Sequence, residues 1–238
     1  MAETATQVDY GLESAITVRQ MFSRCGWTLA FALVIFFINR AEYPGPAARL
    51  LIVLGLIAAA FAGAGVLMLR ASRVDRFQIR DRMLDALGLN GEERVLDVGC
   101  GTGLMSIAAA KRLKSGRVTA VDFSGEADKA KENAKLDGVA EKVRVDSCDN
   151  PKFVYPDNHF DVAVSALALR ASGDSEVRDQ LLRETLRVLK PGGRLAIFDT
   201  VYVSDYAETL RSAGAQSVEI SPMIWYGVMP ARMVTARK

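Results

Sequence analysis

The order of apolar and polar positions between residues 94 and 237 predicts strands that alternate with helices. Five short apolar runs indicate strands at 94–98, 116–122, 142–146, 160–165 and 194–199. The segments at 104–114, 125–137, 176–189 and 204–213 are typical of helices, and two last strands are expected at 217–221 and 232–237. Apolar strands that alternate with helices predict a parallel sheet covered on both faces, which is an α/β fold.

The first 70 residues follow a different pattern. Cys25–Asn39 carries no charge and is rich in Leu, Phe, Ile and Val, and Leu50–Leu69 is an almost wholly apolar run of 20 residues. A helix that crosses a bilayer needs about 20 such residues. The first run has only 15, but residues 21–22 extend its apolar length, and Arg24 and Arg40 can hold their charged ends at the interface. The stretch between the runs contains proline and glycine and is suited to a turn.

A helix pair buried inside a soluble domain is the other interpretation of these runs. A fully apolar helix must be covered on all sides, which a domain of this size can hardly provide. We therefore predict an α-helical transmembrane hairpin at 25–70, preceded by a polar or amphipathic segment at 1–24 and followed by a domain at 71–238. Within that domain, the alternation of charged and apolar residues at 73–87 predicts an amphipathic helix ahead of the first strand.

Arginines predict the orientation of this hairpin. Seven lie on its outer flanks and only two in the connecting loop, so both termini are expected in the cytoplasm. The seven are Arg19, Arg24, Arg70, Arg73, Arg76, Arg80 and Arg82, and the two are Arg40 and Arg49. Small residues recur at every fourth position at Gly55, Ala59 and Gly63, which permits the close approach of a partner helix. That partner is either the first span or a second copy of the chain.

A glycine-rich stretch joins the first strand of the α/β region to the helix after it. It runs from Val95 to Gly103 with the sequence VLDVGCGTG, and its three alternating glycines permit a sharp turn and the close approach of a ligand. Leu104 stands where a G-x-G-x-x-G dinucleotide fingerprint has its third glycine. This departure argues against a pyrophosphate-binding dinucleotide site.

Three later stretches follow in a fixed order. Asp122-Phe123-Ser124 ends the second strand, Cys148-Asp149-Asn150 precedes the fourth, and the Lys-Pro-Gly-Gly of 187–195 precedes the fifth. Together with the glycine stretch they resemble the motifs of class I S-adenosylmethionine (SAM) dependent methyltransferases. The resemblance does not extend to the first 70 residues.

The resemblance implies a Rossmann-like fold whose seven-stranded sheet is mostly parallel, with an antiparallel hairpin at one edge. It also implies SAM as cofactor and S-adenosylhomocysteine as product. Asp97 would hold the amino-acid end of SAM or fix the glycine turn, Asp122 would accept the ribose hydroxyls, and Asp149 would accept the adenine amine. The full set of expected cofactor-binding residues is Asp97, Gly99, Cys100, Gly101, Thr102, Gly103, Asp122, Phe123, Ser124, Asp149, Asn150 and Ser165.

Methyl transfer from a sulfonium is a direct displacement, which requires alignment of the reacting atoms and exclusion of water. A general base is needed only if the acceptor must lose a proton. The sequence does not assign one. Trp225 and Tyr226 either line an acceptor pocket or cover the edge of the sheet. The acceptor-side candidates follow the fourth and fifth strands and are Ser165, Arg170, Asp199, Tyr202, Asp205 and Tyr206.

Composition argues against other function classes. The net charge is +2 and no dense basic run is present, so nucleic-acid binding has no electrostatic support. The chain has one histidine, His159, and three dispersed cysteines, so a His/Cys metal site is hard to assemble and none is expected.

These observations lead to the hypothesis of a membrane-anchored SAM-dependent methyltransferase with its catalytic domain on the cytoplasmic face. The anchor favours a small lipophilic acceptor: a quinone, a lipid, a terpenoid, or a small thiol or amine. A homodimer formed through the membrane helices is left open. The alternatives are a non-catalytic SAM-binding sensor or scaffold subunit, and a soluble small-molecule methyltransferase whose N-terminal helices form a lid or a dimer interface.

Overall fold

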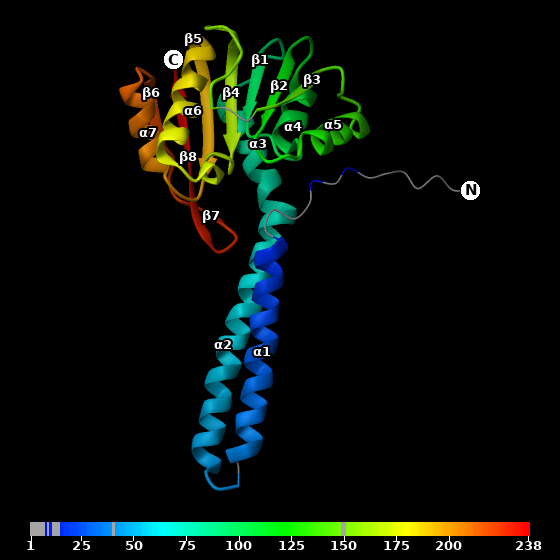
Figure 1. Cartoon of the computed structure of the whole chain (residues 1–238), viewed down its shortest axis with the longest axis vertical. Helices are drawn as coiled ribbons and strands as arrows, with labels where there is room; N and C mark the ends of the chain where they lie inside the picture. The colour runs from blue at the N-terminus through cyan, green and yellow to red at the C-terminus, as the bar shows by residue number, and fades with distance from the viewer. Residues whose placement is uncertain (1–7, 9, 11–14, 40, 149–150) are drawn as a thin grey trace, which may run out of the picture. The chain divides into compact units, whose positions relative to one another are not determined.

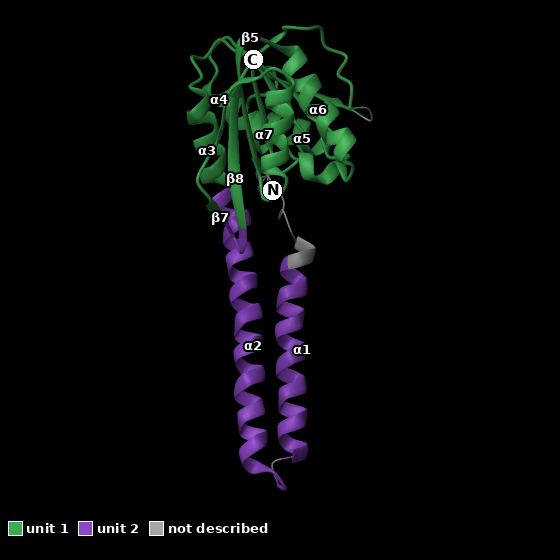
Figure 2. Cartoon of the chain, turned by 90° about the vertical axis from the view of Figure 1, so that its left-hand side faces the viewer, with its two compact units in different colours: residues 1–11, 77–224, 230–238 green, residues 12–76, 225–229 purple. Residues whose placement is uncertain are grey.

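The computed structural model describes residues 8, 10, 15–39, 41–148 and 151–238 (Figure 1). It forms two compact units, of which the first comprises residues 1–11, 77–224 and 230–238 and the second residues 12–76 and 225–229 (Figure 2). The helices are α1 (Ala15–Asn39), α2 (Pro44–Arg70), the π-helical segment η1 (Ala71–Asp75), α3 (Arg76–Leu87), α4 (Leu104–Arg112), α5 (Ala127–Leu136), the 3₁₀ segment η2 (Leu169–Ser172), α6 (Ser175–Val188) and α7 (Val203–Ser212). The strands are β1 (Arg94–Val98), β2 (Arg117–Asp122), β3 (Val143–Ser147), β4 (Phe160–Ala166), β5 (Leu189–Asp199), β6 (Gln216–Ile220), β7 (Ile224–Tyr226) and β8 (Met229–Arg237).

The sheet has the order β3-β2-β1-β4-β5-β8-β6. The first five strands in this order are parallel, and β8 runs antiparallel to both β5 and β6. The α/β Rossmann-like fold expected from the sequence is therefore confirmed. The described residues contain eight strands where seven were predicted, because Ile224–Tyr226 forms β7 and pairs with β8. The two residues between these strands include Gly227, whose φ of +60° suits a tight hairpin turn.

Within the α/β region, the largest difference from the predicted elements is at the start of β5. The strand begins at Leu189, which pairs with Phe160, and the register then shifts before Arg194 pairs with Val162. Pro191, Gly192 and Gly193, which were expected to form a turn before the strand, lie inside it at this irregularity. Proline and glycine within strands are typical of such bulges. The other predicted bounds of the α/β region differ from the observed ones by three residues or fewer.

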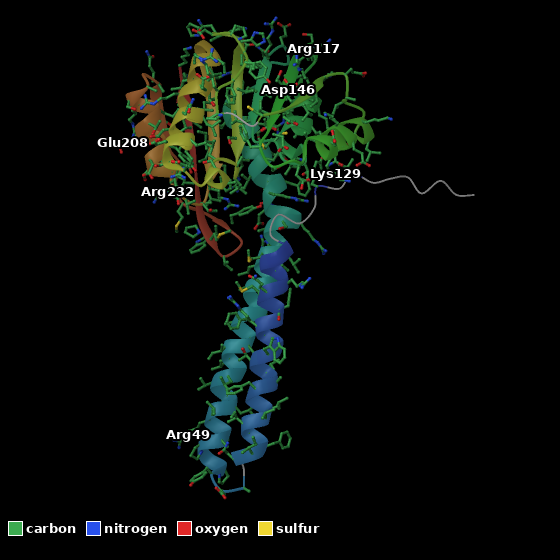
Figure 3. The ribbon with its side chains drawn as sticks, in the orientation of Figure 1. Arg49, Arg117, Lys129, Asp146, Glu208 and Arg232 are labelled. Carbon is green, nitrogen blue, oxygen red and sulfur yellow. The ribbon has the colours of Figure 1, made fainter. Side chains whose placement is uncertain are left out.

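Apolar side chains of the central strands form the core between sheet and helices. In β1, Leu96 and Val98 are fully buried in a cluster with α6, α7, β4 and β5. Neighbouring residues of a strand point to opposite faces, so Asp97 lies on the other face, where Ser106 of α4 contacts it. Charged side chains such as Arg117 of β2 and Glu208 of α7 are exposed at the surface (Figure 3). The alternation within β1 thus directs one carboxylate towards α4.

The second unit contains an α-helical hairpin. α1 begins at Ala15, ten residues before the uncharged run, so the helix is longer than the apolar run predicted from the sequence. Val18–Asn39 and Pro44–Leu87 are long and apolar enough to cross a membrane, judged by length and composition. Few of their residues are buried, and Trp27 is 76% exposed. Arg49 lies near the turn that joins the two helices (Figure 3).

The contact between α1 and α2 does not use the predicted stripe of small residues. Ala58 and Gly65 of α2 are buried, and a Cβ added to Gly65 would approach the Phe22 ring to 3.0 Å. Gly63 and Ala59 are exposed instead. The stripe therefore lies off the face that packs on the first span. Packing of this stripe on the first span is therefore not observed, and a second copy of the chain as its partner stays a prediction.

Candidate cofactor and acceptor site

The glycine-rich stretch forms a tight loop at the C-terminal end of β1. Gly99, Gly101 and Gly103 have φ angles of +78°, +50° and +90°, a region that L side chains rarely adopt. A Cβ at Gly99 would lie 2.2 Å from the Cβ of Ala168, in the segment that follows β4, whereas nothing lies within 4 Å of a Cβ at Gly101. The loop is thus packed at its first glycine and open at its second. Open backbone at the end of a parallel strand is suited to a bound ligand.

Asp97 lies immediately ahead of this loop and is 1% exposed. Its carboxylate accepts a hydrogen bond from the Ser106 hydroxyl in α4. Burial raises the pKa of Asp97 to about 6, and the hydrogen bonds from Ser106 only partly oppose this rise. An ammonium group bound beside the carboxylate would favour its ionised form. The site is therefore suited to a cationic group.

Asp122 ends β2 and is also buried. One of its oxygens accepts from the Ser124 amide at 3.1 Å and from the Ser124 hydroxyl at 2.7 Å, and the other accepts from the Glu126 amide at 2.7 Å. A carboxylate offers about four acceptor positions, so one is left for a ligand hydroxyl. Sequence reasoning missed these bonds, because it assigned Asp122 to the ribose alone.

Two side chains beside the acids differ in exposure. Cys100 is buried, and burial together with the nearby Asp97 and Asp122 raises the pKa of its thiol. The thiol stays protonated and acts as a small packing residue. The Phe123 ring is exposed and lies 3.6 Å from the Cβ position of Gly99. Its free face can cover a flat ring bound at the loop.

The other expected cofactor residues have separate outcomes. Asp149 and Asn150 lie outside the described residues. The Ser165 hydroxyl at the end of β4 donates to the Val98 carbonyl at 2.8 Å, so it ties β4 to β1 beside the loop. The Thr102 hydroxyl donates to the Tyr10 carbonyl at 3.3 Å.

Tyr10 is a contact that the sequence did not predict. Its hydroxyl donates to Asp137 at 3.0 Å, and its ring packs edge-on against Phe77 with a centroid distance of 6.1 Å. Together with the bond from Thr102, these contacts hold Tyr10 against the glycine loop. No motif in the polar N-terminal segment indicated this, since the contact depends on residues more than 60 positions away.

Several acceptor-side candidates meet at the end of β5. Asp199 is fully buried and accepts from the Tyr206 hydroxyl at 3.1 Å, from the Thr200 amide at 2.8 Å and from the Arg170 amide at 3.3 Å. The Arg170 guanidinium pairs with it at 3.8 Å. Burial raises the pKa of Asp199 despite these partners, and burial and Asp199 raise the pKa of Tyr206. Asp205 is exposed on α7 and does not join this cluster.

The last aromatic candidates lie in different surroundings. Tyr202 is half-exposed, and Arg178 of α6, which sequence reasoning missed, lies over its ring at 4.0 Å from the centroid. Trp225 is exposed and Tyr226 buried, both in the second unit. Within the described part of the chain, no group of three or more His, Cys, Asp or Glu could hold a metal ion.

The loop fits SAM. Its open backbone at Gly101, the buried acids at the ends of β1 and β2, and the exposed Phe123 ring match the sulfur-bearing chain, the sugar and the base of that cofactor. The sheet order and this site resemble those of class I SAM-dependent methyltransferases, as the sequence motifs implied.

Comparisons with known proteins agree with this class. Residues 95–193 match the model of the family described as "Methyltransferase domain". A SAM-dependent methyltransferase of Aquifex aeolicus is 26% identical with a TM-score of 0.56, over 66% of this chain and 88% of that one. The cyclase SpnF shares the fold, with 24% identity and a TM-score of 0.59 over 68% of this chain and 80% of its own.

Among curated proteins, the chain resembles the ubiquinone/menaquinone biosynthesis C-methyltransferase UbiE of Azotobacter vinelandii. The two are 37% identical over 118 residues, which is 49% of this chain and 46% of the relative. The protein of the same name from Pseudomonas fluorescens is 35% identical over the same length. The chain spans about half the length of the curated relatives it matches.

Proposed function

We propose that this protein is a membrane-anchored methyltransferase that uses SAM to methylate a small lipophilic acceptor by direct displacement. The observation that carries the proposal is the glycine loop, which is open at Gly101 and flanked by the buried carboxylates of Asp97 and Asp122. The match of residues 95–193 to a methyltransferase domain supports it.

SAM, when bound, supplies a methyl group on a positively charged sulfur. Asp97 would hold the ammonium of the cofactor, and Asp122 would accept a ribose hydroxyl at its remaining acceptor position. Phe123 would cover the adenine, and Asp149 and Asn150 would contact its polar edge. The backbone of Gly99, Cys100, Gly101, Thr102 and Gly103 would enclose the amino-acid chain, and Ser165 would keep β4 and β1 together at the floor of the site.

On the acceptor side, Asp199 is the strongest candidate for a general base. Burial raises its pKa above the ordinary value of a carboxyl, which makes the ionised group a stronger proton acceptor. The Tyr206 hydroxyl has its pKa raised and stays protonated. Tyr206, Arg170 and Thr200 would orient the Asp199 carboxylate. A base is used only if the acceptor arrives protonated.

The membrane anchor is supported by α1 and α2, whose apolar side chains are mostly exposed. Exposed apolar surface on this scale requires a covering, and a bilayer provides it. The arginines on the outer flanks favour a cytoplasmic catalytic domain. The names of the curated relatives, which act in quinone biosynthesis, support a quinone-like acceptor. The division at residues 1–24, 25–70 and 71–238 is part of this proposal.

Calorimetric titration of the full chain with S-adenosylhomocysteine tests the cofactor, and labelled SAM with quinones and membrane lipids tests the transfer. Binding together with label in an organic-soluble product is the expected result. Absence of binding by folded protein would refute the whole proposal. Recovery of the protein in the soluble fraction after an alkaline wash of membranes would refute the anchor, and would favour the soluble alternative.

A non-catalytic SAM-binding sensor or scaffold is the second candidate function. Asp199 and Tyr206 are bonded to each other inside the fold, which is also expected of a purely structural pair. One fold hosts many functions. A chain that binds S-adenosylhomocysteine tightly and transfers no label to a membrane extract would support this candidate.

A further inference from the structure

Arg178 is a buried cation whose hydrogen-bonding capacity is not used up. It lies near the start of α6 and is 8% exposed. Its Nη1 atom is buried and has no hydrogen-bond partner among the described residues. A buried donor of a charged group without an acceptor destabilises the fold. Such a group points to a function that supplies the missing acceptor.

The acids near Arg178 are engaged elsewhere. Asp179, the next residue in α6, accepts from the Thr209 hydroxyl at 2.8 Å. Asp199 accepts from Tyr206 and Thr200 and pairs with Arg170. Neither carboxylate is recorded as a hydrogen-bond partner or ion-pair partner of Arg178. The positive charge of Arg178 is therefore available to a bound anion.

Tyr202 packs against the Arg178 guanidinium through its ring. The guanidinium lies 4.0 Å from the centroid of the Tyr202 ring, and the tyrosine is 44% exposed. Its φ of +59° is unusual for a residue with a side chain and has an energetic cost, which the surrounding structure sustains. The aromatic ring and the cation lie side by side, so a flat ring that packs beside the guanidinium on exposed Tyr202 can direct an oxygen towards Arg178.

We propose that Arg178 and Tyr202 form a subsite for an acceptor that carries an ionised oxygen on a planar ring, either a phenolate or an aromatic carboxylate. This inference rests on the proposed function in taking the bound molecule to be the acceptor. Arg178 donates its unused N–H to the oxygen, and Tyr202 stacks on the ring. A phenolate bound here has already lost its proton. Its oxygen can attack the methyl carbon while the carbon–sulfur bond breaks and S-adenosylhomocysteine leaves, and no base is needed. If an electron-rich ring carbon attacks instead, the same bond breaks, and the proton on that carbon then passes to the base proposed above, Asp199.

Binding assays on the full chain in detergent, saturated with S-adenosylhomocysteine, test this subsite. The probes are a hydroxynaphthoquinone that is ionised at neutral pH, its neutral methyl ether, and naphthoate. We expect the wild type to bind at least one of the two anions about tenfold more tightly than the ether. Which anion binds separates the phenolate from the carboxylate.

Substitutions in α6 test whether Arg178 causes the preference for anionic probes. Arg178→Met should abolish the preference for the anion, Arg178→Lys should keep part of it, and Arg183→Met, at an exposed arginine of the same helix, should leave it intact. Arg178→Met should also keep or raise the Tm without acceptor, because it removes an unpaired buried charge. If Arg178 only stabilised the fold, its replacement by methionine would lower the Tm instead.

Two results would overturn the inference. The first is wild-type protein that binds the anions no more tightly than the ether, or binds none of the probes. The second is an Arg178→Met variant that keeps the wild-type preference for the anion. Both are separate from failure of the proposed function, which would appear as absent S-adenosylhomocysteine binding or absent methyl transfer. If methyl transfer is observed but Arg178 has no effect on anion binding, the proposed function stands and only this inference fails.

Discussion

The Tyr206 hydroxyl lies 3.1 Å from the Asp199 carboxylate and donates a hydrogen bond to it. Asp199 ends β5, Tyr206 lies in the first turn of α7, and both side chains are buried. The pair therefore joins a strand end to the following helix at the edge where Rossmann-like folds bind ligands. The pKa of Asp199 is raised by burial, and the Tyr206 hydroxyl, whose pKa is also raised, stays protonated.

Asp199→Asn tests this acid as a general base. Because burial raises the pKa of Asp199, wild-type kcat should fall as pH drops through that raised value, and the asparagine variant should lose this dependence together with most of its activity. A pH profile of kcat measures both. Tyr206→Phe is the control, and it should cost about 1 kcal/mol of stability for the lost bond. A profile that is identical in wild type and Asp199→Asn would exclude the acid as base.

Gly99→Ala and Gly101→Ala form a matched pair. At Gly99 a Cβ would lie 2.2 Å from Ala168, so we expect a loss of both Tm and S-adenosylhomocysteine affinity. At Gly101 the surroundings are open, so the stability cost should be only the roughly 1 kcal/mol of a left-handed alanine. The affinity of Gly101→Ala for S-adenosylhomocysteine should still fall at least tenfold, because the new methyl group occupies volume that the bound ligand needs. Calorimetry and thermal unfolding separate the two effects, and unchanged affinity in Gly101→Ala would argue against binding at this loop.

Asp97→Asn should separate ligand binding from stability. The pKa of about 6 in the folded protein lies above the ordinary value of 3.8, so the folded state holds the proton that the unfolded state releases. The stability contribution of Asp97 is therefore present below pH 3.8 and lost as pH rises through about 6.

The ligand-free asparagine variant should thus be more stable than the wild type above pH 6, by up to about 3 kcal/mol. Its affinity for S-adenosylhomocysteine should fall at the same time, and wild-type affinity should decrease below pH 6 as the acid becomes protonated. Denaturant unfolding across pH and calorimetry measure these effects. A variant that is less stable at neutral pH would contradict the account.

Gly65→Leu and Gly63→Leu test the packing of the hairpin. A Cβ at Gly65 would approach the Phe22 ring to 3.0 Å, whereas nothing lies within 4 Å of one at Gly63. The Gly65 variant should lower the Tm in detergent by several degrees, and the Gly63 variant should not. Cross-linking adds a second readout, because loss of a dimer in Gly63→Leu alone would indicate that the exposed stripe joins two copies. Equal Tm losses in both variants would contradict the α1–α2 contact.

The sequence by itself determined the strands and helices of the α/β region, the glycine loop and the apolar hairpin. Each of these depends on local patterns: apolar runs, glycines with positive φ at fixed spacing, and runs of uncharged residues. The acids Asp97 and Asp122 could be found because they lie at or next to the ends of strands of predictable position. Their local spacing carries the information, and no distant residue is needed to locate them.

The tertiary structure alone decided how these groups are engaged. The bond of Asp97 to Ser106, the packing of Tyr10 on the glycine loop, the engagement of Asp199 by Arg170 and Tyr206, and the unpaired Arg178 under Tyr202 all join residues from different elements. Likewise, Gly65 rather than the predicted stripe contacts α1. Sequence periodicity gives the face of an element, but which side chains meet across elements, and which donors stay unpaired, depends on the packing of the whole unit.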